Sequence, residues 1–122
     1  MRMRVLETST AGGAHVVEVT GEIDIATVEA LEERLLGAIE AGHRPVLLDL
    51  GHCTFIDSTG IHLLLRAHAR LSEAGEAGPS LVLVARGRVL NLFRVTALDR
   101  TVPIAATREQ AELLLGSAGA KV

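Results

Sequence analysis

A serine stands directly after an aspartate in the segment Phe55-Ile56-Asp57-Ser58-Thr59-Gly60-Ile61. The apolar pattern before Ser58 predicts a buried strand, and the pattern after it predicts a helix that begins at about this residue. A helix start offers unpaired backbone N–H groups and the positive end of the helix dipole, so it stabilises an anion placed there. Ser58 is therefore well placed to receive a phosphate and poorly placed to catalyse a reaction unaided.

Ser58 also has a simpler interpretation, because serine is one of the residues preferred at the N-terminal cap of a helix. Position alone favours that interpretation. Asp57, however, can cap the helix itself and leave the Ser58 hydroxyl free to face solvent. Thr59 is a further candidate for the cap or for the phosphate acceptor. Gly60 has no side chain, so we expect it to let another protein's active site approach the hydroxyl closely.

The elements that position this segment follow from the hydrophobic pattern and from the glycine and proline residues between its periodic stretches. We predict strands at 3–8, 14–20, 46–50, 81–85 and 101–104. We predict helices from a cap at Asp24 to a stop at Gly42, and then at 58–74, 88–96 and 108–115. The order is ββαβαβαβα, an α/β fold whose mixed sheet begins with an antiparallel hairpin.

Two predicted loops meet at one edge of this sheet, because the carboxyl ends of parallel strands gather ligand and partner sites. These loops are 21–24, after the second strand, and 51–58, after the third. If the two strands are parallel neighbours, Asp24 lies beside Asp57 and Ser58. Asp24 is expected to cap the first helix, and a contact with a partner is compatible with that role.

The composition bounds the class of protein. The chain of 122 residues is one domain of ordinary size, with an ordered core at about 3–115 and a loose tail at 116–122. It has two phenylalanines, no tryptophan or tyrosine, and a net charge of −3, which argues against direct binding of nucleic acid. No apolar run is long enough to span a bilayer and no signal-peptide core is present, so we expect a cytoplasmic protein without membrane contact.

Cysteine and histidine give no sign of a metal or redox site. Cys53 is the only cysteine, so the chain forms no internal disulfide and no cysteine cage. The histidines are scattered without metal-ligand spacing.

The chain also lacks a glycine-rich phosphate loop with its lysine and the catalytic loops of kinases, so it cannot phosphorylate itself. We expect no catalytic residue, no metal and no cofactor bound by this chain.

Several motifs in this order resemble those of the bacterial anti-sigma factor antagonists, the small STAS-domain proteins. The segment Asp57-Ser58-Thr59-Gly60-Ile61 looks like their phosphorylation motif. Gly21-Glu22-Ile23-Asp24 resembles their Gly-Glu-(Leu/Ile)-Asp turn, and 89–98 resembles their third helix. The resemblance covers about residues 4–115, which makes the whole chain a single STAS domain.

The chain departs from the family pattern at two positions. His62 stands where many members have glycine, just inside the second helix, and we expect it to affect the choice of partner. Ala97 stands where the third helix often ends in glycine. Neither departure removes the phosphate acceptor.

The resemblance implies a mixed sheet with about four helices and a function in partner switching. The unphosphorylated antagonist binds an anti-sigma factor and frees a sigma factor for transcription. The anti-sigma factor is also a serine kinase that uses Mg-ATP, and a separate phosphatase reverses the modification. The matching acceptor is Ser58, with Thr59 as the alternative. The residues expected to face the partner are Asp24, Asp57, Ser58, Thr59, Gly60 and His62.

Three other functions compete with this interpretation. A STAS domain that meets no kinase would serve as a scaffold or a ligand-binding module, but Ser58 is present. A receiver-type domain would accept phosphate on Asp49 or Asp57, yet the chain opens with a hairpin and has no acidic pair after its first strand. A serine hydrolase would need a Gly-x-Ser-x-Gly elbow, which the sequence lacks.

Overall fold

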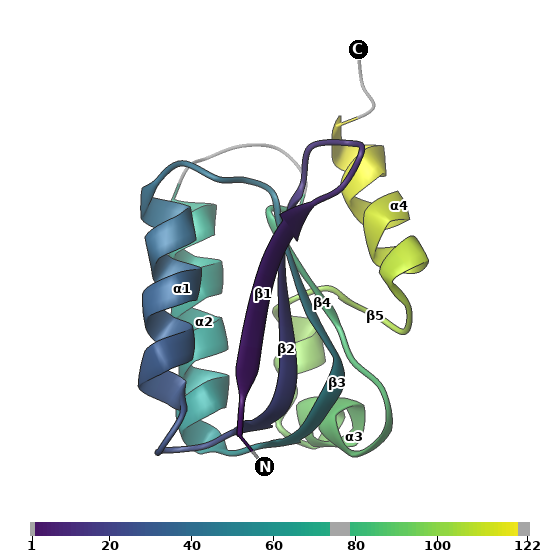
Figure 1. Cartoon of the computed structure of the whole chain (residues 1–122). Helices are drawn as coiled ribbons and strands as arrows, with labels where there is room; N and C mark the ends of the chain where they lie inside the picture. Colours follow the sequence, from purple (N-terminus) through teal and green to yellow (C-terminus); the bar gives the residue numbers. More distant parts are fainter. Residues whose placement is uncertain (1, 74–78, 120–122) are drawn as a thin grey trace.

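The computed structural model describes residues 2–73 and 79–119, with side chains to Leu115. Its five strands form one sheet in the order β1-β2-β3-β4-β5 (Figure 1). The strands are β1 (Arg4–Ser9), β2 (His15–Ile23), β3 (Val46–Ile56), β4 (Leu81–Val84) and β5 (Ile104–Ala105). β1 and β2 are antiparallel and every later pair is parallel, so the predicted fold class and element order are confirmed.

Helices cover both faces of the sheet. They are α1 (Val28–Glu40), α2 (Ser58–Ser72), α3 (Gly87–Val95) and α4 (Arg108–Gly119), with a short 3-10 helix at Leu98–Arg100. In Figure 1, α1 and α2 lie side by side on one face, and α4 lies on the other. None of the helices in the described residues is long and apolar enough to cross a membrane.

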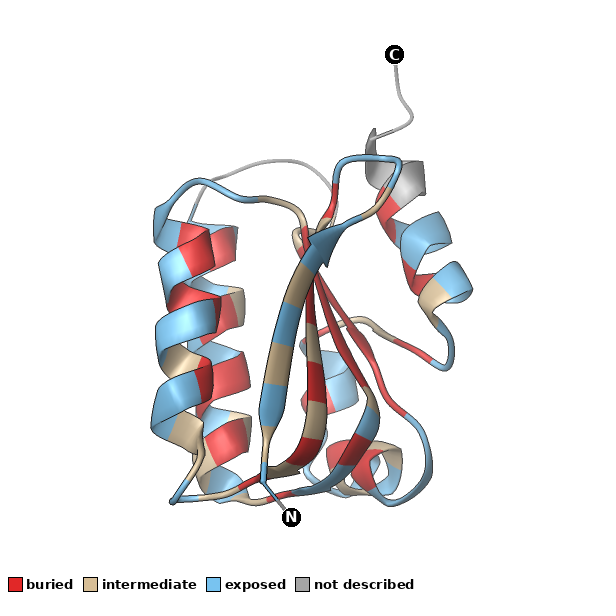
Figure 2. Ribbon diagram, in the orientation of Figure 1, coloured by how far each residue is buried: buried red, intermediate tan, exposed pale blue. Residues whose placement is uncertain are grey.

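The core has two parts, one on each side of the sheet. The larger part joins the sheet to α1, α2 and α3, and the smaller part joins it to α4. Residues 46–50 of β3 and all of β4 are buried on both faces, as Figure 2 shows by their continuous red colour. This burial agrees with the sequence of these strands, which is apolar except for Asp49 and is typical of interior parallel strands.

β2 and β3 both continue beyond their predicted ends, so the loops predicted at 21–24 and 51–58 are largely strand. Their pairing survives two register shifts, the second between Gly21 and Glu22. Gly21 has a φ of +104°, and a Cβ there would lie 2.5 Å from the backbone oxygen of Arg2. The irregular pairing at this point of β2 therefore requires glycine. As a result, Asp57 alone separates β3 from α2.

Three helix predictions need correction. α1 begins at Val28 with Thr27 at its N-cap, so Asp24 does not cap it. α4 continues to Gly119, so the tail predicted to be loose at 116–122 is helical as far as that residue, and 120–122 lie outside the described residues. In α2 the apolar spacing 61, 64, 65, 68 and 71 predicts the inner face; Leu64 and Leu71 are buried as this predicts, but Leu65 is 38% exposed and Leu63 is fully buried in its place. The end predicted for this helix, at residue 74, falls outside the described residues.

Asp49 is a buried acidic residue that ties α4 to the sheet. Arg108, the first residue of α4, donates to Asp49 Oδ2 from Nη2 at 3.0 Å and from Nε at 3.2 Å. The backbone N–H of Gly51 donates to the other carboxylate oxygen at 2.9 Å, and Glu18 lies 3.7 Å from the same guanidinium. Asp49 is therefore engaged in a structural ion pair, which gives no support to its use as the acceptor of a receiver-type domain.

Candidate functional site

Asp57 caps α2, as its position in the sequence predicted. Its Oδ1 accepts the backbone N–H of Thr59 at 3.0 Å and that of Gly60 at 3.4 Å. The Thr59 hydroxyl donates to the same oxygen at 2.5 Å. One carboxylate oxygen thus satisfies two free N–H groups of the helix start and also holds the side chain of Thr59.

Ser58 is the first residue of α2 and is exposed to solvent. In the part of the chain that the structure describes, its hydroxyl has no hydrogen-bond partner. The two adjacent hydroxyls therefore differ: that of Thr59 is occupied by the cap, and that of Ser58 is available. This is the arrangement expected if Asp57 caps the helix in place of Ser58.

The pKa of Asp57 lies below its ordinary value of 3.8, so this carboxylate is ionised at neutral pH. The strongest cause is the hydrogen bond from the Thr59 hydroxyl, and slight burial opposes it. Backbone N–H groups of Gly60, Thr59 and Ile25 add to the lowering. Ile25 belongs to the turn after β2, so Asp57 also connects that turn to the start of α2.

Asp24 closes the turn between β2 and α1. Its Oδ1 accepts the backbone N–H of Ala26 at 2.9 Å, and its backbone N–H donates to Thr27 Oγ1 at 2.9 Å. The Thr27 hydroxyl in turn donates to the backbone oxygen of Glu22 at 2.9 Å. The side chain of Asp24 thus bonds two residues ahead in an Asx turn and does not reach the helix, which is why the predicted cap is wrong.

The turns after β2 and β3 lie side by side, as predicted for parallel neighbours. Ile23 pairs with Ile56 at the ends of the two strands, and the backbone N–H of Asp57 donates to the oxygen of Ile23 at 3.1 Å. Asp24 follows Ile23 directly, and Ser58 follows Asp57. The site therefore consists of two short turns at one end of the sheet, the lower end in Figure 1.

Gly60 is buried, and its missing side chain points into the protein. A Cβ at this position would lie 2.6 Å from Ile56 Cγ1 and 2.8 Å from Ile23 Cγ2. The expectation that Gly60 opens the approach of a partner is therefore wrong. The glycine instead allows the first turn of α2 to pack directly on the ends of β2 and β3, which fixes the position of Ser58.

His62 is exposed and lies one turn after Ser58 on α2. His62, Arg66 and Arg70 form a stripe that recurs every four residues along α2, a spacing that predicts a solvated helix face and leaves a contact with the partner as the alternative. Both arginines are exposed and bind α1: Arg66 lies 2.9 Å from Glu32 and Arg70 lies 3.1 Å from Glu40. The stripe therefore joins two helices, and only His62 lies near the serine.

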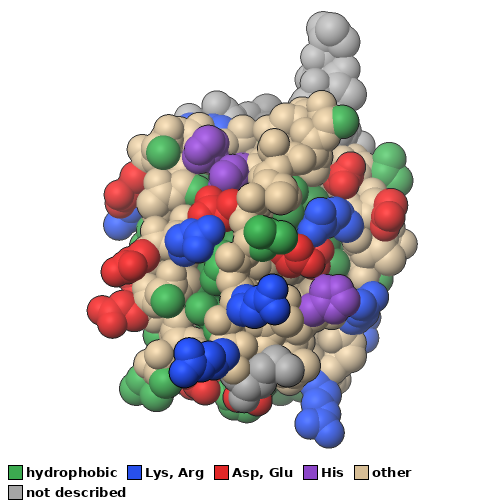
Figure 3. Space-filling model, in the orientation of Figure 1, with side chains coloured by type: hydrophobic (Ala, Val, Ile, Leu, Met, Phe, Trp, Pro, Cys, Tyr) green, Lys and Arg blue, Asp and Glu red, His purple; other side chains and the backbone are tan. Residues whose placement is uncertain are grey.

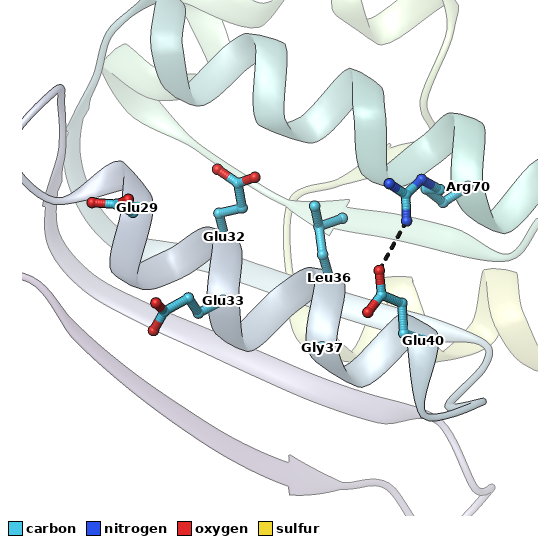
Figure 4. A pocket seen from close by; sticks show the side chains of 7 residues that line it. All are labelled: Glu29, Glu32, Glu33, Leu36, Gly37, Glu40 and Arg70. Atoms are coloured by element: carbon cyan, nitrogen blue, oxygen red, sulfur yellow. Dashed lines mark hydrogen bonds and ion pairs between the residues drawn. The ribbon is translucent and has the colours of Figure 1, made fainter.

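A groove of about 410 Å³ runs between α1 and α2 (Figure 4). Four glutamates line it, together with Leu36, Gly37 and Arg70, and the Arg70–Glu40 ion pair crosses it. So acidic a lining is poorly suited to a typical cofactor or drug-like ligand, whose pocket is mostly apolar with a few polar groups. The groove therefore gives no support to a ligand-binding module.

The described residues offer no other centre of chemistry. No three histidine, cysteine, aspartate or glutamate side chains among them are grouped so that they could hold a metal. Cys53 is buried, burial raises the pKa of its thiol, and it donates to the backbone oxygen of Phe55 at 3.3 Å. On the face shown in Figure 3, acidic and basic side chains are interspersed and do not form a field of one sign.

Sequence reasoning missed two exposed apolar residues, one in the turn after β2 and one near the end of β3. Ile25, in the turn after β2, is 79% exposed, and Phe55, near the end of β3, is 48% exposed. A phenylalanine in a strand pattern is normally assigned to the core, so the sequence offered no signal for its exposure. For Ile25 there was one signal: it follows Asp24 directly in a predicted turn, and residues in turns are often exposed.

The family model described as the STAS domain matches residues 5–111. The chain belongs to the STAS domain family. The anti-sigma-B factor antagonist of Staphylococcus aureus is 31% identical over 93 residues, which cover 76% of this chain and 84% of the relative. The family resemblance carried by the three segments at 21–24, 57–61 and 89–98 is therefore confirmed.

Solved structures show the same fold in this STAS domain family. An anti-sigma factor antagonist from Mycobacterium paratuberculosis is 28% identical with a TM-score of 0.82, and the match covers 92% of each chain. The phosphorylated form of SpoIIAA, a cell fate determinant from Bacillus, is 21% identical with a TM-score of 0.65. That match covers 88% of this chain and 96% of the other, and at this identity it supports the fold alone.

Proposed function

We propose that this STAS domain protein is an anti-sigma factor antagonist whose unphosphorylated form binds an anti-sigma factor and frees a sigma factor. Phosphorylation of Ser58 ends the binding. The observation that carries the proposal is the exposed, unbonded Ser58 hydroxyl at the start of α2, next to the ionised carboxylate of Asp57. The names of the Staphylococcus and Mycobacterium relatives support the choice of partner.

The phosphoryl group comes from a kinase, which we take to be the anti-sigma factor itself. The Ser58 oxygen attacks the γ-phosphorus of Mg-ATP, its proton passes to a base of the kinase, and ADP leaves. This chain contributes the acceptor and its position, and the kinase supplies the metal and the nucleotide. A separate phosphatase hydrolyses the phosphoserine and restores the binding form.

Ser58 is a better acceptor than Thr59 because of the cap. The Thr59 hydroxyl is a donor to Asp57 and would have to leave that hydrogen bond before it could react. A threonine phosphate would also be placed against the carboxylate that caps the helix. The Ser58 hydroxyl has neither restriction, since it faces solvent in the first turn of α2.

The charge of the phosphate is sufficient to switch binding. Phosphoserine carries about −1.5 to −2 charges and three acceptor oxygens. The start of α2 can hold this dianion in the free protein. A partner surface that had covered a neutral hydroxyl would then face a desolvated dianion beside Asp57 and Asp24, and an unpaired buried charge costs several kcal/mol. A loss of about 3 kcal/mol weakens binding more than a hundredfold.

The proposal is tested with the purified anti-sigma factor of the same organism. With Mg-ATP, the parent is expected to gain one phosphate at Ser58, located by mass spectrometry, and Ser58→Ala to gain none. By calorimetry, Ser58→Ala is expected to bind like the parent and Ser58→Asp to bind poorly. Thr59→Val is the matched control, and its phosphorylation is expected to persist. Labelling that moves to Thr59, or tight binding of the phosphorylated parent, would contradict the proposal.

A further inference from the structure

We propose that Ile25 and Phe55 are the apolar anchors on which the anti-sigma factor docks, an inference that rests on the function proposed above. Their side chains are 79% and 48% exposed, and both belong to the seven large apolar side chains that are exposed among the described residues. Single exposed apolar residues are common on protein surfaces, so exposure alone does not make a docking site. The argument depends on where these two lie.

Ile25 lies in the turn after β2 and Phe55 near the end of β3, in two neighbouring segments at the end of the sheet where Ser58 begins α2. Ile25 is two residues after Ile23, whose backbone oxygen accepts the N–H of Asp57 at 3.1 Å, so the turn that holds Ile25 lies beside the start of α2. Phe55 pairs with Glu22 across β2 and β3 and lies two residues before Asp57, a Cα separation of about 7 Å in an extended strand. The five other exposed large apolar side chains of the described residues lie outside these two segments: Leu6 on β1, Leu65 further along α2, Val95 at the end of α3, and Leu113 and Leu114 on α4.

The switch itself requires apolar contacts at these positions. A phosphate at the wet rim of an interface would keep its hydration and would change the affinity little. For on–off control, the Ser58 hydroxyl must lose its water when the complex forms. Large apolar side chains around a central group exclude water from it, which is how the energetically important centre of an interface is built. Ile25 and Phe55 are placed to do this for Ser58.

The occupant is therefore a surface of the anti-sigma factor with an apolar pocket and basic groups beside it. The apolar part receives Phe55 and Ile25, and the basic groups face Asp57, which is ionised, and Asp24. This surface fits the neutral hydroxyl closely and has no room for a hydrated dianion. The apolar anchors supply affinity, and the Ser58 hydroxyl supplies control.

The test measures the affinity of single variants for the purified anti-sigma factor loaded with Mg-ADP, so that no phosphate is transferred. Ile25→Ala and Phe55→Ala are each expected to raise Kd by about tenfold or more, as truncation of an interface anchor does. Leu113→Ala, which removes a side chain that is 72% exposed on α4, is the matched control and is expected to leave Kd unchanged. Phe55→Leu, which keeps apolar area, is expected to recover much of the loss.

Each outcome decides between the two proposals. If Ile25→Ala and Phe55→Ala bind like the parent while Ser58→Asp does not, the anchors are wrong and the proposed function stands. If the parent itself does not bind, the function fails and the anchors fail with it. Thermal unfolding checks that the variants fold, and Ile25, the more exposed of the two, keeps the test decisive if Phe55→Ala proves unstable.

Discussion

Ser58 and Thr59 are adjacent residues with the same functional group, and the geometry of one helix cap separates their chemistry. The carboxylate of Asp57 takes the Thr59 hydroxyl and two backbone N–H groups, so the remaining hydroxyl is the one that faces solvent. Gly60 allows the first turn of α2 to pack against the end of β3, because any side chain there would collide with Ile56. Ser58 would normally be interpreted as the helix cap, but because Asp57 takes that role, its hydroxyl is open to modification.

Ala97 is a single residue whose backbone conformation lowers the stability of the fold. It follows α3 with a φ of 62°, the left-handed conformation in which helices commonly end at a glycine. An L-residue with a Cβ pays about 1 kcal/mol for this conformation. We therefore expect Ala97→Gly to raise the free energy of unfolding by up to about 1 kcal/mol, measured by urea denaturation.

The matched control is Ala69→Gly, at an exposed position inside α2. Glycine adds the same freedom to the unfolded chain at both positions, but in a helix interior it gains nothing in return. Ala69→Gly is expected to lower the free energy of unfolding by about 1 kcal/mol. Equal changes at the two positions would show that the conformation of Ala97 is not strained.

At the scale of elements, the attachment of α4 depends on the ion pair between Arg108 and Asp49. Removing one partner of a buried pair leaves the other charge uncompensated. Because Arg108 is about one third exposed, we expect Arg108→Ala to cost about 1–2 kcal/mol, less than the loss of a fully buried pair. Hydrogen exchange measured by mass spectrometry is expected to rise in α4 before it rises in α2.

A second variant separates the charge from the packing. Replacing both partners, in Arg108→Met with Asp49→Leu, removes the charges but keeps the apolar volume, so much of the lost stability is expected to return. If the double variant is as unstable as Arg108→Ala, the ion pair is not what holds α4.

The elements also show what the sequence could predict. Their order follows from apolar spacing and from glycine and proline residues, and the Asp57 cap follows from an aspartate before a helical pattern. The far ends of β2 and β3 could not be predicted, because Gly21 and the polar residues His52 and Thr54 interrupt the strand pattern where the register shifts. The exposure of Phe55 was hidden for a related reason, since only tertiary contacts decide which side of an irregular strand is covered.

At the scale of the whole molecule, the parallel pairing of β2 and β3 creates the site. It brings together two turns that are more than 30 residues apart and places the starts of α1 and α2 at the same end of the sheet. Cross-helix ion pairs from Arg66 and Arg70 then hold α2 against α1. Ser58 lies at the start of α2, at the end of the sheet where the two turns meet, so an added charge there acts directly on any partner that covers these turns.

The charges that hold this fold together make its stability depend on pH. The pKa of Glu7 is below its ordinary value of 4.5: burial raises it, but hydrogen bonds from Arg34 and His15 outweigh that effect. The pKa of Glu32 is lowered mainly by its hydrogen bond from Arg66. A carboxylate with a lowered pKa in the folded state stabilises the fold above its unfolded pKa, and that contribution is lost as the pH falls through the folded pKa.

We therefore expect the free energy of unfolding to be level from neutral pH down to about pH 4.5 and to decrease below it, in urea titrations at a series of pH values. In Arg34→Met, Glu7 loses its strongest partner, so its pKa is expected to rise and the decrease below pH 4.5 to become shallower. Arg88→Met is the matched control, because Arg88 is exposed and has no ion-pair partner among the described residues. An acid decrease in Arg34→Met as steep as in the parent and in Arg88→Met would show that Glu7 gains its stability elsewhere.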